Sequence, residues 1–217
     1  MISTAYLAGQ YLKQKNFNKK VYIVGSSGIS RELDAIGIKH TGVGPDVIQG
    51  TLQSLVKEEF KHDPEVGAVV VGFDEHISFP KLMKAASYLS DPETLFIGTN
   101  TDERFPMPNF VVPGTGTIVR AIETCAERKA VVMGKPENYL CEIFFKEEIK
   151  RDPKKFLMVG DRLNTDIWFG NNNNFQTLLV ETGVHKIDKV QEIVDKVNNN
   201  EGEPDLEQQI PDFYISS

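Results

Sequence analysis

The sequence predicts an α/β fold in which two series of strands and helices each form a mainly parallel sheet. Short apolar runs that end in glycine alternate with segments of helical periodicity along nearly the whole chain, and this alternation is typical of βαβ units. Residues 101–116 interrupt the alternation with three prolines and two glycines. We therefore expect two domains, residues 1–128 and residues 129–217, with a boundary near Lys129.

The first series begins with an amphipathic helix, because Tyr6, Leu7, Tyr11 and Leu12 recur at helical spacing. Ser30 precedes a further segment of helical periodicity and is expected to be its N-cap. In chain order, the elements predicted after the first helix are a strand at 21–25, the helix after Ser30, a partly helical stretch at 47–62, a strand at 68–73, a helix at 77–89 and a strand at 94–100.

The second series follows a predicted helix at 117–129. Its elements are a strand in AVVMGKP (130–136), a helix at 138–149, a strand at 156–161, a helix at 165–170, a strand at 177–183, a helix at 189–197, a polar loop at 198–209 and a final strand at 211–217. The chain stops at this strand and starts equally abruptly, so we expect the natural chain to continue at both ends.

The composition is that of a soluble globular protein, with 40% hydrophobic and 25% charged residues among 217. A net charge of −7 disfavours a nucleic-acid partner, because binding a phosphate backbone relies on Lys and Arg. No apolar run reaches the roughly 18 residues that span a bilayer, and the N-terminus lacks the features of a signal peptide. We expect a cytoplasmic protein without a membrane partner, whose Cys125 and Cys141 are reduced and packed as small apolar residues.

Two carboxylates follow the strand predicted at 156–161. Asp161 lies at the carboxyl end of that strand, where open α/β sheets bind ligands, and Asp166 lies in the first turn of the next helix. Such oxygens suit Mg²⁺, a hard cation that takes few protein ligands and keeps several waters. The alternative is purely structural, since Asp is also common in turns and at helix N-termini.

A lysine follows the preceding predicted strand. Lys135 comes after Gly134 and before Pro136, at the expected start of a helix. By itself, a lysine in this position is more typical of the protein surface than of a binding site. If the strands before GKP and GD are consecutive in one βαβ unit, Lys135 and the Asp161/Asp166 pair lie on the same edge of one sheet. The two motifs together therefore predict a phosphate and metal site.

These motifs resemble those of a known family. GKP (134–136), VGDRLNTDI (159–167) and LLVETGV (178–184) are similar to the third and fourth motifs of haloacid-dehalogenase-like (HAD-like) phosphatases with a large α/β cap of the C2 type. The group that the sequence resembles contains phosphoglycolate phosphatase and pyridoxal phosphate phosphatase, and its members are also called 4-nitrophenylphosphatases. The resemblance extends through VGFDEHISFPKL, FIGTNTDERFPMP and PDFY, and favours the phosphoglycolate member. It implies a C2 cap plus the C-terminal half of a HAD-like Rossmannoid core.

The resemblance also implies roles for particular residues. Lys135 matches the lysine that steadies the phosphoryl group, Asp161 the magnesium ligand, and Asp166 the carboxylate that supports the metal site. In the cap, the matching substrate-binding residues Asn100, Asp102 and Arg104 lie in the family's specificity region, a loop that is also typical of a solvated turn. Glu75, the fourth, lies with Asp74 and His76 in a neighbouring cap motif. His76 is the only histidine with a functional neighbourhood, and we expect His40, His62 and His185 at the surface.

One expected motif is missing. Family members use an Asp-X-Asp motif, whose first Asp attacks phosphorus and whose second Asp protonates the leaving group and then activates water. The sequence contains no Asp-X-Asp. We therefore expect a magnesium-dependent phosphatase of small phosphorylated metabolites, chiefly 2-phosphoglycolate, that acts through an aspartyl-phosphate in a full-length protein but is inactive as this chain. The resemblance suggests a homodimer formed through the cap.

Two alternatives remain from the sequence. The chain could be a shortened, non-catalytic isoform that binds metabolites or forms dimers through the cap. It could also be a receiver-like or nucleotide-binding α/β protein. Its glycine pattern gives the second alternative no support, because neither Gly25–Gly28 nor Gly42–Pro45 has the spacing of a dinucleotide fingerprint.

Overall fold

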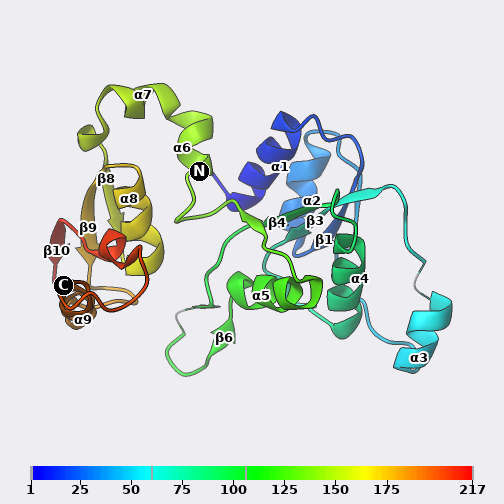
Figure 1. Cartoon of the computed structure of the whole chain (residues 1–217). Coiled ribbons are helices and arrows are strands. Elements are labelled where there is room, and N and C mark those ends of the chain that lie inside the picture. The colour runs from blue at the N-terminus through cyan, green and yellow to red at the C-terminus, as the bar shows by residue number, and fades with distance from the viewer. Residues whose placement is uncertain (1, 60, 106, 217) are drawn as a thin grey trace. The chain divides into compact units, whose positions relative to one another are not determined.

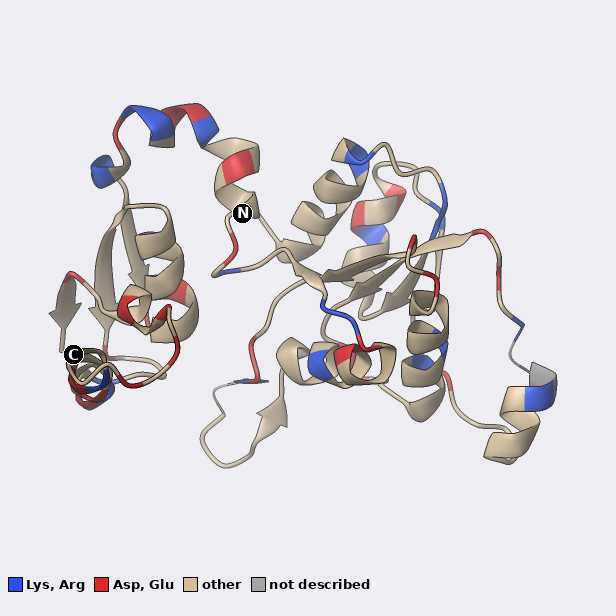
Figure 2. Ribbon diagram, in the orientation of Figure 1, with Lys and Arg blue, Asp and Glu red and all other residues tan. Residues whose placement is uncertain are grey.

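The computed structural model of the chain describes residues 2–59, 61–105 and 107–216 (Figure 1). The chain divides into two compact units, Met1–Met133 and Gly134–Ser217, which we call unit 1 and unit 2. Each is an α/β unit with a parallel sheet. Lys and Arg are interspersed with Asp and Glu along the ribbon of both units (Figure 2).

Unit 1 is built on a five-stranded parallel sheet in the order β2-β1-β3-β4-β7. Its strands are β1 (Lys20–Val24), β2 (His40–Thr41), β3 (Val66–Val71), β4 (Leu95–Gly98) and β7 (Val131–Val132). Its helices are α1 (Thr4–Gln14), α2 (Ser27–Asp34), α3 (Leu52–Ser54), a π-helix η1 (Leu55–Glu59), α4 (Phe79–Leu89) and α5 (Thr115–Ala126). A separate antiparallel pair joins β5 (Arg104–Phe105) to β6 (Val112–Pro113).

The central strand β3 explains how this sheet is covered. All six of its residues are buried, as expected for a parallel strand with helices on both faces. Val69 and Val71 pack in one cluster with Leu89 of α4 and Ile122 of α5. By strand alternation Val70 points to the opposite face. Helices α1 and α2 lie on the other side of the sheet from α4 and α5 (Figure 1).

The helix boundaries of unit 1 correct the expected N-cap and agree with the partly helical stretch. The helix predicted to start after Ser30 begins at Ser27, with Ser26 as N-cap. Ser30 lies inside it and donates its hydroxyl hydrogen to the Ser27 carbonyl at 3.0 Å. In the stretch predicted to be partly helical at 47–62, the helical residues are α3 and η1, and residue 60 lies outside the described residues.

Unit 2 contains a three-stranded parallel sheet in the order β10-β9-β8. The strands are β8 (Leu157–Gly160), β9 (Gln176–Val180) and β10 (Phe213–Ile215). The helices are α6 (Tyr139–Phe144), α7 (Lys146–Arg151), α8 (Trp168–Asn172) and α9 (Ile187–Asn198), with short turns of helix η2 (Pro153–Lys155), η3 (Leu163–Ile167) and η4 (Leu206–Gln209). The predicted final strand is confirmed, whereas the helix predicted at 138–149 is interrupted at Phe145.

The strand before GKP corrects the predicted topology. Strand β7 pairs with β4 in the sheet of unit 1, whereas β8 pairs with β9 in the sheet of unit 2. The prediction that the strands before GKP and GD share one sheet is therefore wrong. An apolar run predicts a strand, but its pairing partner depends on contacts between residues far apart in the chain.

Strand β8 is an edge strand of its sheet in the part of the chain that the structure describes. Its side chains Leu157 and Val159 are 53% and 50% exposed. On the interior side, Leu179 of β9 packs with Leu163 and Ile167 of η3 and with Val190 of α9. Exposed apolar side chains on an edge strand are typical of a strand that accepts a further neighbour.

Candidate functional site

Unit 2 brings Lys135 and Asp166 into contact. The Lys135 ammonium group donates to Oδ1 of Asp166, and the carboxylate is almost completely buried whereas the lysine side chain is half exposed. The second oxygen of Asp166 accepts the backbone N–H groups of Asp161 and Arg162, each at 3.1 Å. Asp166 therefore joins the GKP segment to the turn after β8, although the strands before these two segments, β7 and β8, belong to different sheets.

Asp161 is held by the loop that follows β9. Its Oδ2 accepts the N–H of Val184 at 2.8 Å, and its backbone carbonyl accepts the N–H of His185 at 3.0 Å. A Cβ at Gly183 would overlap the Asp161 carboxylate, and one at Gly160 would overlap that of Asp166. Both glycines are thus required by close approach rather than by an unusual backbone angle.

His185 supports the same turn from outside the predicted motifs. Its Nδ1 accepts the N–H of Leu163 at 2.9 Å, so the ring is neutral with its proton on Nε2. Burial lowers the pKa of His185, and the positive charges of Arg162 and Lys189 lower it further. The expectation of a plain surface histidine is wrong here, because the side chain is half-buried and bonded to the turn that carries Asp161.

The donor set at this turn suits a hard cation only in part. One Asp161 oxygen accepts the Val184 N–H, which leaves Oδ1 for a cation such as Mg²⁺. Both oxygens of Asp166 are already occupied by Lys135 and two backbone N–H groups. Within residues 2–59, 61–105 and 107–216, no three His, Cys, Asp or Glu side chains form a group that could hold a metal ion.

Unit 1 gathers the other predicted residues at the carboxyl edge of its sheet. Glu75 follows β3, and Asn100 follows β4. Phe73 and Phe105 bring the two loops together through an edge-to-face contact with ring centroids 5.1 Å apart. Glu75 and Arg104 are exposed on these loops, so both can reach a ligand in solvent.

Asn100 and Asp102 have structural partners in this loop. The Asn100 Oδ1 accepts the N–H of Asp102 at 3.1 Å, and the carbonyl of Asp102 accepts the N–H of Gly116 at 2.8 Å. A Cβ at Gly114 would overlap the Asp102 carbonyl. The loop is therefore fastened to the start of α5. Residue 106, in the segment 101–116 that follows the predicted strand, lies outside the described residues.

The predicted residues thus form two groups, one in each unit. Sequence reasoning missed His185 and the buried Lys81. The position of Lys81 could have been found, since Lys81, Ala85 and Tyr88 follow one face of α4 at i, i+4 and i+7.

The two free thiols also differ, because Cys141 is buried as expected whereas Cys125 is exposed.

Comparison with known proteins assigns the family. Residues 132–205 match the family model described as HAD-hydrolase-like. The chain is 39% identical over its whole length to the glycerol-3-phosphate phosphatase of Rattus norvegicus, of which it covers 67%. It is 35% identical to the 4-nitrophenylphosphatase of Schizosaccharomyces pombe, covering 99% of the chain and 69% of that protein. It is also 35% identical to human chronophin, covering 100% and 68%.

Solved structures agree with this assignment. A p-nitrophenyl phosphatase from Archaeoglobus fulgidus matches with a TM-score of 0.69 and 25% identity, covering 98% of this chain and 69% of that one. A glycerol phosphate phosphatase from Mycobacterium tuberculosis in complex with magnesium matches with the same TM-score and identity, covering 100% and 56%. The chain spans about two thirds of the length of its curated relatives.

The fold is an α/β fold in which a lysine motif, GKP, lies beside a carboxylate motif after β8. The chain belongs to the HAD-like hydrolases, in the group of phosphatases that carry an α/β cap. The predicted resemblance and fold class are thereby confirmed. No helix in the described ranges is long and apolar enough to cross a membrane.

Proposed function

We propose that the protein is a magnesium-dependent phosphomonoester hydrolase of small phosphorylated metabolites, to which this chain contributes Lys135, Asp161 and Asp166. The observation that carries the proposal is the bonding of Asp166, whose carboxylate joins Lys135 to the backbone of Asp161 and Arg162. This arrangement places a positive charge and a carboxylate at one turn, which is the combination that phosphoryl transfer requires.

Each residue has a distinct part in this proposal. The half-exposed Lys135 ammonium group would bind the phosphoryl oxygens, and the buried Asp166 would orient it. Asp161 would offer its Oδ1 to magnesium, whose charge, when bound, offsets the negative charge of the phosphoryl group. The structure of the relative from Mycobacterium tuberculosis in complex with magnesium supports this choice of cation.

The nucleophile is proposed to come from outside these 217 residues. The sequence holds no Asp-X-Asp, and the apolar edge of β8, with Leu157 and Val159 half exposed, is suited to a further parallel strand. On this view, the chain by itself does not hydrolyse phosphoesters. The competing proposal is a non-catalytic isoform that binds metabolites or forms dimers through unit 1.

The substrate is proposed to be a short phosphoester. The relatives named glycerol-3-phosphate phosphatase and the TNTDERFP motif support glycerol-3-phosphate or 2-phosphoglycolate, with Glu75, Asn100, Asp102 and Arg104 in the loops that select it. We also propose a cytoplasmic homodimer formed through unit 1. The exposed Phe110 and Val111 support such contacts.

The test measures phosphate release with Mg²⁺ from 2-phosphoglycolate, glycerol-3-phosphate and 4-nitrophenyl phosphate. This chain is compared with a form extended through the coding sequence that precedes it, each with and without a chelator. Magnesium-dependent activity only in the extended form supports the proposal. Activity in neither form favours the non-catalytic isoform. Activity in the short chain that Asp161→Asn abolishes would show that the nucleophile lies within these residues.

A further inference from the structure

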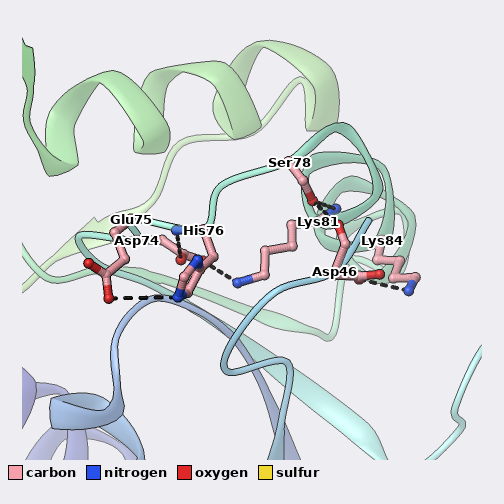
Figure 3. A network of polar contacts seen from close by, with 7 residues as sticks. All are labelled: Asp46, Asp74, Glu75, His76, Ser78, Lys81 and Lys84. Atoms are coloured by element: carbon pink, nitrogen blue, oxygen red, sulfur yellow. Dashed lines mark hydrogen bonds and ion pairs between the residues drawn. The ribbon is translucent and has the colours of Figure 1, made fainter. Parts of the chain in front are cut away.

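Unit 1 contains a buried ion pair between Asp74 and Lys81. The Asp74 Oδ2 and the Lys81 Nζ are 2.5 Å apart, with side chains 2% and 0% exposed. Lys81 extends from the first turn of α4 to the loop after β3 (Figure 3). A pair of this kind gains little stability over apolar residues of the same shape, because both charges lose their hydration. Stability alone therefore does not account for the pair.

The Asp74 carboxylate holds the turn that follows it. Its Oδ1 accepts the N–H of His76 at 2.9 Å, and the Asp74 carbonyl accepts the N–H of Ile77 at 3.2 Å. Because Oδ2 is bonded to Lys81 at the same time, the turn at 74–77 is connected directly to α4.

The start of α4 is anchored as well. Ser78 is the N-cap of α4 and accepts the N–H of Lys81 at 3.4 Å. Its hydroxyl donates to the carbonyl of Asp46 at 2.5 Å, and the Asp46 carboxylate pairs with Lys84 at 2.8 Å (Figure 3). Lys81 therefore projects from a helix end whose position is set by independent bonds.

The side chains carried by this turn are turned outward. Glu75 and His76 are 72% and 45% exposed, with Oε1 and Nε2 3.7 Å apart. They lie at the carboxyl edge of the sheet, where Phe73 contacts Phe105 of the neighbouring loop. An exposed turn without internal bonds would sample many conformations. The exposed pair thus depends on a buried anchor for a defined position.

We propose that the Asp74–Lys81 pair is a positioning device that holds Glu75 and His76 at the edge of unit 1 to bind the part of the substrate remote from phosphorus. Glu75 accepts hydrogen bonds from hydroxyl groups there, and the His76 Nε2 supplies a donor or an acceptor. Asp74 and Lys81 act only through the turn, because both are buried and cannot touch a substrate. The inference rests on the proposed phosphatase function.

The test removes the pair without leaving a buried charge. The double variant Asp74→Leu/Lys81→Met replaces both residues with apolar ones of similar volume, and we expect it to keep the melting temperature of the parent. Lys84→Met is the matched control, since it deletes an ion pair of the same helix that does not contact Asp74. The single variant Lys81→Met would leave an unpaired buried carboxylate and is not informative about positioning.

Two readouts separate this inference from the proposed function. In the 217-residue chain, exchange of the His76 amide hydrogen should be about tenfold faster in the double variant, because the loss of one hydrogen bond changes the exchange rate by about that factor. In Lys84→Met the exchange rate should be unchanged. In the extended form, KM for glycerol-3-phosphate or 2-phosphoglycolate should rise about tenfold, with kcat and the hydrolysis of 4-nitrophenyl phosphate nearly unchanged.

The outcomes are distinct. Unchanged exchange at His76 in a folded double variant would overturn the inference whatever the activity. Faster exchange with an unchanged KM would also overturn the inference, because it would show that the position of the turn does not affect substrate binding. If the parent hydrolyses no ester, the proposed function fails, and the inference fails with it even where the exchange result is as expected.

Discussion

Lys135 and Asp166 are joined by an ion pair across 31 positions of the sequence, and the same Asp166 carboxylate accepts the backbone N–H groups of Asp161 and Arg162. A single buried side chain therefore sets both the position of the lysine ammonium group and the shape of the turn that presents Asp161. This bonding leads to the first two predictions.

Asp166→Asn should lower kcat of the active form about 10- to 100-fold, the usual effect of losing a residue that orients a metal or phosphate ligand. The amide that replaces the carboxylate leaves Lys135 without its anionic partner. Lys135→Met and the double variant complete a mutant cycle measured by phosphate release. If the two residues act as one unit, the double variant loses no more activity than the worse single variant. Additive losses would contradict the shared role.

Asp161→Asn should raise the Mg²⁺ concentration needed for half-maximal activity by at least about tenfold, because an amide oxygen carries no charge for a hard cation. A magnesium titration of phosphate release measures the effect. The control is Asp188→Asn, at an exposed position in the first turn of α9. Equal magnesium requirements in the parent and the Asp161 variant would count against Asp161 as the ligand.

Gly160→Ala should destabilise the protein by about 1–3 kcal/mol, because the added methyl group overlaps the Asp166 carboxylate. Gly28→Ala is the matched comparison. Gly28 lies in α2, and the nearest neighbouring atom to an added Cβ there is the Ser26 Oγ at 3.8 Å. Its replacement should be neutral or slightly stabilising, since Ala favours a helix over Gly. Urea unfolding of both variants decides between these outcomes, and equal effects would refute the argument from close approach.

His185 should make stability depend on pH. Burial lowers the pKa of His185 in the folded protein from its ordinary value of 6.5, so the unfolded chain binds more protons between the two pKa values. Stability should therefore fall as the pH drops through about 6.5 and level off below the folded-state pKa. Protonation of Nδ1 also removes the acceptor for the Leu163 N–H.

The measurement for His185 is the urea midpoint at several pH values between 7.5 and 5.5. His185→Gln should show a shallower decline than the parent protein. His76→Gln, which removes an exposed histidine of unit 1, is the comparison variant. An unchanged slope in His185→Gln would assign the pH dependence to other groups.

Tyr22→Phe should stabilise unit 1 by about 1 kcal/mol, because a buried hydroxyl without a partner costs free energy. The Tyr22 hydroxyl is buried and finds no hydrogen-bond partner within residues 2–59, 61–105 and 107–216. Tyr88, which packs against it, is bonded to the backbone of Asp63. Tyr88→Phe should therefore destabilise unit 1. A higher melting temperature for Tyr22→Phe and a lower one for Tyr88→Phe, each relative to the parent, would confirm the contrast.

Local patterns in the sequence were sufficient for most of the fold. Alternating apolar runs and helical periodicity predicted β1, β3, β4, β8, β9 and the final strand β10. The GKP and GD motifs predicted that Lys135 and the carboxylates after β8 lie at one edge of a single sheet. Lys135 does contact Asp166, but the strands before the two motifs belong to different sheets. The helix start at Ser27 rather than Ser30 was missed, because several serines in one turn can act as N-cap and packing selects among them.

By itself, the sequence determined the fold class, the family and the residues at the turn after β8, because these depend on local propensity and on short motifs. Only the tertiary structure decided that β7 joins the sheet of unit 1, that Lys81 is buried against Asp74, and that His185 bonds the turn of Asp161. Strand partners and burial arise from contacts between distant residues, and periodicity along the chain carries no information about which distant residues meet.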